Sequence, residues 1–235
     1  MTQNWKEVWN RRTASGEGLD LDVLLKLDGF DTVVSRVEVS DWLTYAEIIA
    51  EKLGIYDGAT MFEVGCGAGA LLYAFHERYS LSVGGIDFAT GLITAAKMAM
   101  PNGQFKVQEA KSLKITPQYD YVIANGVFHY FDLAYAAKVL ARMIKKSKIA
   151  IAVMEVPDLK TKNESEAMRR DMLTQGEYEK KYAGLAHTYY DRDWFRDQAT
   201  LHGLECELFD GCVPNYAQNR FRFGCIIRIN NKVIS

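Results

Sequence analysis

A glycine-rich turn and a later acidic residue are the first features in this chain that could do chemistry. The turn reads EVGCGAG at residues 63–69, and glycines let a backbone turn sharply and approach a ligand closely. Asp87 follows 22 residues after Gly65, where a carboxylate can accept hydrogen bonds from the hydroxyls of a ribose. With a strand before the turn and a helix after it, the free N–H groups of the helix face the ligand. The spacing therefore predicts a nucleoside site.

The elements needed to position these residues follow in the hydrophobic pattern. Strands are expected at 61–64, 82–86, 105–108, 121–124 and 149–154, with helices at 71–79, 92–100 and 133–145. This alternation is typical of βαβ units around a parallel sheet, and the almost wholly apolar fifth strand should be covered on both faces. Two more strands, 205–210 and 221–229, follow a helix at 191–202 without a helix between them. They are expected to pair antiparallel at the edge of the sheet.

Helical segments are expected on either side of this core. Trp5, Val8 and Trp9 recur at helical spacing, and Ser40 and Asp41 can cap a helix at 42–53. A turn-rich stretch at 27–32 separates these two helices, and a polar helix is expected at about 163–182. We predict one domain, 1–235, with a helical cap at 1–58, a ligand-binding core at 59–155, a helical insertion at 156–190 and a final helix and β-hairpin at 191–235.

The composition excludes several classes of protein. The 235 residues are 49% hydrophobic and 25% charged, as in an average globular domain. A net charge of -2 without a basic block argues against nucleic-acid binding. The longest aliphatic run, 149–153, is far shorter than the roughly 20 residues that span a bilayer, so no membrane partner is expected. The four cysteines form no C-x-x-C pair, which indicates neither zinc nor disulfides. We expect a cytoplasmic protein without a metal.

The main alternative reading of the glycine turn and Asp87 is a site for a dinucleotide such as NAD or NADP. The pattern Gly65-x-Gly67-x-x-Ala70 also satisfies the fingerprint of NAD(P)-dependent reductases. Glu63 argues against it, because a carboxylate repels a nearby pyrophosphate but attracts an ammonium or sulfonium group. The chain also lacks a second βαβαβ half. A non-catalytic module that binds a nucleoside or a protein partner stays open as a third reading.

The ordered motifs resemble those of class I S-adenosylmethionine-dependent methyltransferases. They are EVGCGAG at 63–69, GID at 85–87, EA at 109–110 and YDYVIANGVFHY at 119–130. The resemblance covers residues 60–155 well and continues in outline to 229. It implies a doubly wound α/β fold whose seven-stranded, mostly parallel sheet has the order 3-2-1-4-5-7-6, with strand 7 antiparallel. It also implies S-adenosylmethionine as the cofactor and S-adenosylhomocysteine as its product.

The resemblance also implies roles for individual residues. Glu63 and Gly65 would face the methionine part of the cofactor, and Asp87 would hold the ribose hydroxyls. Phe88 would pack on the adenine, and Trp5 and Trp9 are similar to a W-x-x-x-W helix that covers the cofactor in some small-molecule methyltransferases. The expected cofactor residues are Glu63, Gly65, Cys66, Gly67, Gly69, Asp87, Phe88, Glu109, Ala110, Asn125, Gly126, Trp5 and Trp9.

The residues after the fourth strand are candidates to touch the substrate, because such sheets bind ligands beyond the carboxyl ends of their strands. His129, with Tyr130 beside it, is the best candidate for a base, since a neutral imidazole can accept a hydroxyl proton near pH 7. It could equally hydrogen-bond only the loop or the cofactor. An aromatic-rich stretch at 187–194 could cover the site or be ordinary packing, and an arginine in the loop at 212–220 suggests an anionic substrate or a solvated hairpin tip. The expected substrate residues are His187, Tyr189, Tyr190, Tyr216, Asn219 and Arg220.

The sequence therefore predicts methyl transfer from S-adenosylmethionine to a small molecule, with oxygen favoured as the acceptor atom. A sulfonium is already a good electrophile, so the protein mainly holds the reacting atoms about 3 Å apart and aligned. The identity of the acceptor and the oligomeric state stay open.

Overall fold

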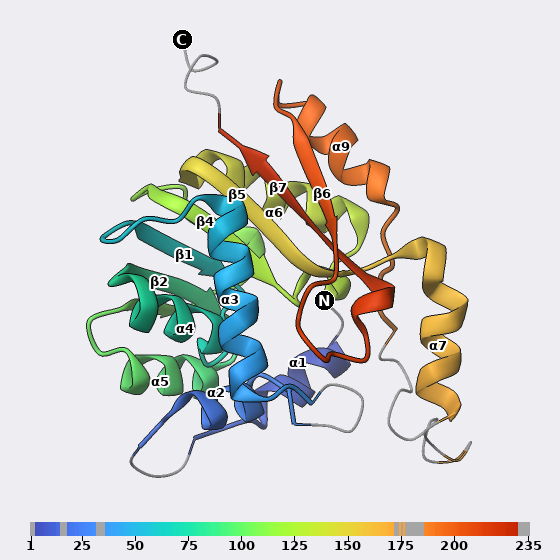
Figure 1. Ribbon diagram of the computed structural model, residues 1–235, viewed down its shortest axis with the longest axis horizontal. Helices are drawn as coiled ribbons and strands as arrows, with labels where there is room; N and C mark the ends of the chain where they lie inside the picture. Colours follow the sequence, from blue (N-terminus) through green and yellow to red (C-terminus); the bar gives the residue numbers. More distant parts are fainter. Residues whose placement is uncertain are drawn as a thin grey trace.

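Seven strands of the computed structural model form one mixed sheet with helices on both faces (Figure 1). The structure describes residues 3–14, 18–31, 36–171, 174, 176 and 186–229. The strand order is β3-β2-β1-β4-β5-β7-β6, and β7 runs antiparallel to both β5 and β6. The predicted doubly wound α/β fold, its strand order and its antiparallel strand 7 are confirmed.

Each strand lies close to its predicted position. The bounds are β1 Thr60–Val64, β2 Ser82–Asp87, β3 Gln104–Val107, β4 Tyr119–Asn125, β5 Ser147–Pro157, β6 Cys206–Asp210 and β7 Arg222–Arg228. Successive residues of the inner strands face opposite sides of the sheet. Met61 of β1 packs in one hydrophobic cluster, whereas Phe62 and Val64 pack in the other. Both faces are therefore buried, which explains why the inner strands are mostly apolar.

Helices supply the two layers that cover the sheet (Figure 1). On one face α3 (Val39–Leu53), α4 (Ala70–Tyr79) and α5 (Thr90–Ala99) share the first cluster. On the other face α6 (Leu133–Lys146) and α9 (Arg192–Thr200) share the second. The remaining helices are α1 Gln3–Asn10, α2 Leu21–Leu27 and α7 Lys162–Asp171, with short 3-10 turns η1 Ala110–Ser112, η2 Phe128–Tyr130, η3 Leu159–Thr161 and η4 Asn219–Phe221.

Predicted helix boundaries shift by one or two residues at α5 and α9, and two other helices differ in ways that have a physical reason. The predicted caps Ser40 and Asp41 were wrong, because α3 begins at Val39 with Glu38 as its N-cap. Val37 and Trp42 are both buried in the first cluster, so the chain already packs on the core before the predicted helix start. Asp41 then lies in the first turn, where the helix dipole favours an acid. The polar helix expected at 163–182 is seen as α7, Lys162–Asp171, and most of the remaining predicted range lies outside the described residues.

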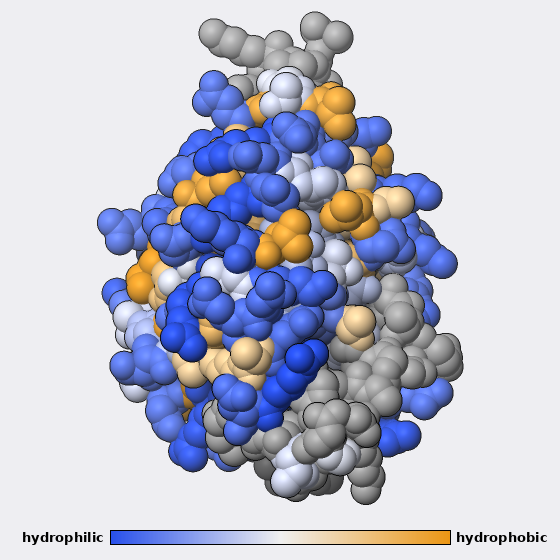
Figure 2. Space-filling view, turned by 90° about the vertical axis from the view of Figure 1, so that its right-hand side faces the viewer, coloured by the Kyte–Doolittle hydropathy of each residue, from blue (hydrophilic) through white to orange (hydrophobic). Residues whose placement is uncertain are grey.

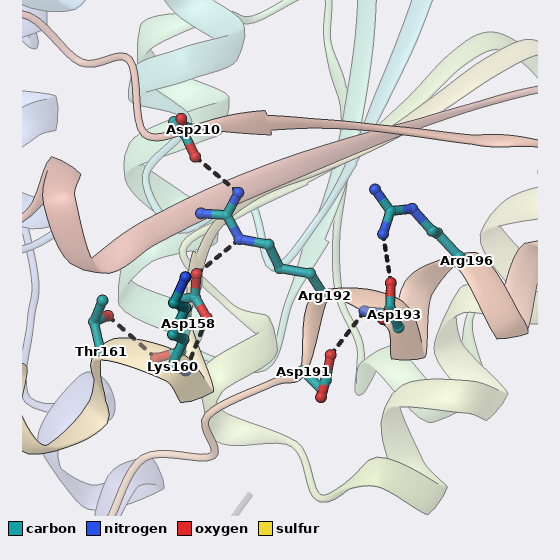
Figure 3. Close-up of polar contacts among 8 residues, drawn as sticks. All are labelled: Asp158, Lys160, Thr161, Asp191, Arg192, Asp193, Arg196 and Asp210. Atoms are coloured by element: carbon teal, nitrogen blue, oxygen red, sulfur yellow. Dashed lines mark hydrogen bonds and ion pairs between the residues drawn. The ribbon is translucent and has the colours of Figure 1, made fainter.

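A polar cluster around Arg192 joins the start of α9 to the ends of β5 and β6 (Figure 3). Arg192 donates through Nε to Asp158 Oδ2 at 2.7 Å and through Nη1 to Asp210 Oδ1 at 2.8 Å. Asp158 is buried, and its Oδ1 accepts from the backbone N–H of Lys160 at 2.9 Å. Tyr190 exchanges backbone hydrogen bonds with the residues on either side of Asp158. These contacts therefore fix Tyr190 and the start of α9 against the end of β5.

Figure 2 shows the side of the molecule on which α7 and α9 lie. The described residues on this side are mostly hydrophilic, with hydrophobic residues in small, scattered groups. Isolated exposed hydrophobic side chains such as Leu201, at 76% exposure, are usual on protein surfaces. Within the described ranges, no helix is long and apolar enough to cross a membrane.

Candidate active site

A cavity of about 390 Å³ lies at the carboxyl ends of the parallel strands, beside the glycine turn. Its walls come from the ends of β1, β2, β4 and β5, from the loop after β3, and from α1 and the segments around residues 28–30, 187 and 216–222. This volume lies within the range of small-molecule sites, about 300–1,000 Å³. The position agrees with the rule that open α/β sheets bind ligands beyond the carboxyl ends of their strands.

Most of the predicted site residues line this one cavity. They are Glu63, Gly65, Cys66, Gly67, Asp87, Phe88, Glu109, Ala110, Asn125, Gly126, Trp5, Trp9, His129, Tyr130, His187 and Tyr216. Gly69, Tyr189, Tyr190, Asn219 and Arg220 do not line it. The cavity also contains residues that the sequence did not single out, above all Asp28, Glu155, Arg169 and Arg222.

The glycine turn needs glycine for both conformation and space. Gly65, Gly67 and Gly69 have φ values of 74°, 53° and 87°, which lie in the left-handed region. A Cβ on Gly65 would lie 2.6 Å from a methyl group of Val127, and one on Gly67 would lie 2.2 Å from Asp28 Oδ1. Gly69 is the N-cap of α4 and shapes the turn from behind. The backbone of Gly65 and Gly67 therefore forms the floor of the cavity.

Asp28 caps α4 from a distant part of the chain. Its Oδ1 accepts from the N–H of Ala68 at 2.6 Å and its Oδ2 from the N–H of Ala70 at 3.0 Å. The N-cap Gly69 has no side chain of its own to do this. Burial is the main cause that raises the pKa of Asp28 to about 7, and the charge of Asp87 adds to it. No local sequence signal marks Asp28, because its partners lie about 40 residues further on.

Asp87 and Glu63 extend this acidic wall. Asp87 Oδ2 accepts from the N–H of Gly67 at 3.2 Å and Oδ1 from that of Ala89 at 2.8 Å, so it joins β2 to the glycine turn. Glu63 is 3% exposed, and its Oε2 has no hydrogen-bond partner among the residues described. Burial, together with the charges of Asp28 and Asp87, raises the pKa of Glu63 well above 4.5. A buried, unpartnered carboxylate indicates that a ligand with a positive charge or N–H donors belongs here.

The opposite end of this wall is closed by α1. Lys6 forms an ion pair with Glu109, in the loop after β3. Phe88, Glu109 and Ala110 line the cavity beside this contact. The contact joins α1 to the loop where the resemblance expects the adenine.

His129 lies across the cavity, in η2 after β4. It is buried, and its Nδ1 has no partner in the described part of the chain. Burial lowers its pKa well below 6.5, and the nearby His187, Arg222 and Arg169 lower it further. His129 is therefore a neutral imidazole at pH 7 but a weak base. Burial also raises the pKa of Tyr130 well above its usual range, so this phenol stays protonated.

The roof over His129 is made by α1 and the segment 186–190. Trp5 stacks on His187 with ring centroids 5.0 Å apart and meets Tyr130 edge-on at 4.8 Å. Its Nε1 donates to the carbonyl of residue 186 at 3.3 Å. The N–H of Thr188 donates to the carbonyl of His129 at 2.8 Å. These contacts place the predicted N-terminal tryptophan and the predicted aromatic segment over the same part of the cavity.

His187 has a defined tautomer. Arg169 Nη2 lies 2.9 Å from His187 Nδ1, and because a guanidinium can only donate, Nδ1 must accept. The ring proton is then on Nε2, which is buried without a partner among the described residues. Burial lowers the pKa of His187 well below 6.5, and Arg169 and Arg222 contribute. His187 therefore presents a neutral N–H donor.

The arginine in the cavity is Arg222, two positions after the predicted Arg220. Arg220 is exposed and lies over the ring of Phe221 at 4.5 Å. The turn η4 ends between them, so Arg222 begins β7 and points into the cavity at 6% exposure. The prediction that Arg220 lies over the pocket was therefore wrong. A charged residue at the start of an otherwise apolar strand is the signal that could have found Arg222.

The other predicted substrate residues support the walls from behind. The buried hydroxyl of Tyr190 donates to the carbonyls of Phe128 and Phe131, both at 2.9 Å, and so holds the loop that carries His129. Tyr189 contacts Ser165 of α7 through its hydroxyl at 3.3 Å. Asn219 hydrogen-bonds the backbone of Val213 through both its amide oxygen and its amide nitrogen. Within the described ranges, no group of three or more His, Cys, Asp or Glu residues could hold a metal ion.

Comparison with known proteins gives the class. Residues 61–148 match the family model described as "Methyltransferase domain". The chain is 24% identical over 150 residues to trans-aconitate 2-methyltransferase of Enterobacter sp. (strain 638), across 62% of this chain and 58% of that protein. It thus spans less than two thirds of the length of this curated relative.

Solved structures agree on the fold. Magnesium protoporphyrin IX methyltransferase of Synechocystis PCC 6803 with bound S-adenosylmethionine superposes with a TM-score of 0.60 at 12% identity, over 97% of this chain and 92% of that one. An amino pentose methyltransferase of Micromonospora echinaspora with bound S-adenosylmethionine gives 0.63 at 11% identity, over 92% and 100%. The chain therefore has the class I, Rossmann-like fold of these structures, and its residues 61–148 match a methyltransferase domain. Both of these solved structures contain S-adenosylmethionine.

Proposed function

We propose that the protein transfers a methyl group from S-adenosylmethionine to an oxygen atom of a small, anionic acceptor. The observation that carries the proposal is the charge distribution within one cavity. Asp28, Glu63 and Asp87 line the wall next to the glycine turn, whereas Arg169 and Arg222 lie among the cavity residues with the two histidines. S-adenosylmethionine carries a positive sulfonium and ammonium, so the acidic wall attracts it, while the cationic part attracts an acidic acceptor. We expect this reaction to take place in the cytoplasm.

The acidic wall would hold the cofactor along its length. Glu63, whose Oε2 is unpartnered among the residues described, would accept from the ammonium of the methionine part. Asp87 already accepts two backbone N–H bonds, and a carboxylate has room for ribose hydroxyls as well. Phe88 would pack on the adenine beside Glu109. Asn125, fixed by the Tyr45 hydroxyl at 2.9 Å, and Gly126 would line the methyl-donor end.

The properties of His129 and Tyr130 favour an acceptor that is already ionised. An alcohol must lose its proton as it is methylated, and a base with a strongly lowered pKa, such as His129, assists that poorly. A carboxylate is already ionised and needs no base. The curated relative is named for the methylation of trans-aconitate, an acid, which supports the same choice. His129 and Tyr130 would then position the acceptor rather than deprotonate it.

The reaction would be an in-line displacement. A lone pair of the acceptor oxygen attacks the methyl carbon, and the electrons of the breaking carbon–sulfur bond stay on sulfur, which leaves neutral S-adenosylhomocysteine. The roof of Trp5 and His187 would keep water away from the sulfonium and strengthen the electrostatic contacts inside. The main contribution of the protein would be the alignment of the two reactants.

Calorimetry with S-adenosylmethionine, S-adenosylhomocysteine, NAD and NADP tests the cofactor. We expect binding of the first two only, because the acids beside the glycine turn offer no positive charge to a pyrophosphate and any of them that ionises repels it. Transfer of a labelled methyl group is then measured with carboxylic acids, trans-aconitate included, and with alcohols, phenols and amines. Methyl esters of the acids are the expected products. Preferential binding of NAD or NADP would favour a reductase, and cofactor binding without transfer to any metabolite pool would favour a non-catalytic module.

A further inference from the structure

Arg222 is a buried cation whose hydrogen-bonding capacity is mostly unused. Its side chain is 6% exposed, and Nη2 donates to Gln218 Oε1 at 2.8 Å. Its Nε and Nη1 are buried, and neither has a hydrogen-bond partner in the described part of the chain. A buried guanidinium with unsatisfied N–H groups is costly for a folded protein. Such a group is retained where an anion binds.

The surroundings of Arg222 in the cavity include further donors. Because Arg169 donates to Nδ1 of His187, the ring proton is on Nε2. This Nε2–H is also buried, and it has no hydrogen-bond partner among the described residues. The charge of Arg222 lowers the pKa of both His187 and His129, so its field acts on both rings. An oxyanion can accept from a guanidinium at two positions and from an imidazole N–H at a third.

Glu155, the acid on whose pKa the charge of Arg222 acts, does not neutralise Arg222 fully. Glu155 is buried in β5, next to a register shift in the pairing of β5 with β7, and its φ of 56° lies in the left-handed region. Burial raises the pKa of Glu155 to about 7 even though Arg222 lowers it, so the carboxyl is only partly ionised at neutral pH. Glu155 therefore balances Arg222 incompletely and leaves positive charge for a ligand.

We propose that Arg222 and the Nε2–H of His187 form a subsite that binds a carboxylate of the methyl acceptor, separate from the oxygen that receives the methyl group. Hydrogen bonds from a guanidinium withdraw electron density from an oxygen, so the group held here is an anchor and the nucleophile lies nearer the acidic wall. The acceptor is then an acid with a second polar oxygen group. In naming the methyl acceptor as the ligand, this inference rests on the proposed function.

Two matched variants test the subsite without knowledge of the acceptor. Arg222→Gln removes the buried charge, whereas Arg220→Gln removes the exposed arginine two residues away. Thermal unfolding without ligand should show Arg222→Gln as stable as the wild type or more stable, since an uncompensated buried cation is lost. A clear loss of stability in Arg222→Gln alone would show that Arg222 serves the fold, and would overturn the subsite.

Binding is then measured in the presence of saturating S-adenosylhomocysteine. The probes are aliphatic and aromatic mono-, di- and tricarboxylates, each with its methyl ester as the neutral control. The wild type should bind acids and not their full esters, and Arg222→Gln should weaken the best acid about tenfold or more. An equal loss in Arg220→Gln, or wild-type protein that binds none of the acids, would overturn the subsite.

The same experiment separates this inference from the proposed function. Wild-type protein that does not bind S-adenosylhomocysteine would refute the proposed function itself. Protein that binds S-adenosylhomocysteine and methylates neutral alcohols, but neither binds nor methylates acids, would leave methyl transfer to oxygen standing and remove the carboxylate subsite together with the anionic acceptor.

Discussion

Replacement of Asp28 by Asn tests whether the glycine turn carries an electrostatic cost in the absence of cofactor. Burial raises the pKa of Asp28 from 3.8 to about 7 in the folded protein, while the unfolded chain releases this proton near 3.8. Between these pH values the folded state binds more protons than the unfolded state. The contribution of Asp28 to the free energy of unfolding therefore falls as the pH rises through this window.

The magnitude follows from the two pKa values. A difference of about 3 pH units corresponds to on the order of 4 kcal/mol. Solvent reaches part of this side chain and screens its charge, so we take roughly half, ~2 kcal/mol. Asn stays neutral, but its amide nitrogen cannot accept from the second of the two backbone N–H groups, which costs about 1 kcal/mol. At pH 8 the Asp28→Asn protein should therefore unfold about 2–4 °C above the wild type, as a domain of this size shifts by about 2–4 °C per kcal/mol.

Thermal unfolding followed by circular dichroism at pH 5 and pH 8 measures this difference. At pH 5 wild-type Asp28 is protonated as well, so the variant gains nothing there and should unfold about 2–4 °C below the wild type because of the lost hydrogen bond. Asp22→Asn, at an exposed acid of α2, is the matched control and should change little at either pH. If Asp28→Asn is less stable than the wild type at pH 8, the hydrogen bonds from Ala68 and Ala70 to the ionised carboxylate outweigh its burial, and the reasoning fails.

Three further variants probe the cofactor site and its roof. Glu63→Gln should weaken S-adenosylmethionine and S-adenosylhomocysteine to a similar extent in calorimetry, since both carry the ammonium that Glu63 would hold; unchanged affinity for both would contradict this role. Asp87→Ala should lower the affinity for S-adenosylhomocysteine at least tenfold, because charge-assisted hydrogen bonds contribute roughly 1.5–3 kcal/mol each; unchanged affinity with an intact circular dichroism spectrum would exclude the ribose role. Trp5→Ala should slow turnover and abolish the hydrogen-exchange protection that S-adenosylhomocysteine gives α1, because Trp5 contacts both Tyr130 and His187; wild-type protection confined to residues 60–130 would refute a closing roof.

The core of the site could be predicted because it is local in the sequence. The glycine turn, the strand before it and the helix after it lie within twenty residues of one another, and left-handed glycines are required wherever such a turn is built. Asp87 and Asn125 end the two strands that flank β1, so a correct strand order suffices to bring them to the same edge. The periodicity of apolar residues carried that information.

Predictions for the loops depended on single residues and were less accurate. In the loop before β7, the sequence offers arginines at 220 and 222, and only the rotation of the chain through η4 decides which one faces the cavity. Tyr190 was predicted as a substrate residue because it is aromatic. Its hydroxyl instead donates to the carbonyls of Phe128 and Phe131 and does not line the cavity. Hydrogen bonds between distant segments determine such cases, and no local pattern records them.

By itself, the sequence determined the class of fold and the floor of the cofactor site, because backbone conformation and hydrophobic period are local properties. The charge pattern of the cavity depended on the tertiary structure. Asp28, Glu155 and Arg222 come from a turn after α2, from an irregular point in β5 and from the start of β7. Burial raises the pKa of both acids, while the charge of Asp87 acts on Asp28 and that of Arg222 acts on Glu155. Desolvation and charge–charge interaction act through space, so they became defined only once the chain had folded.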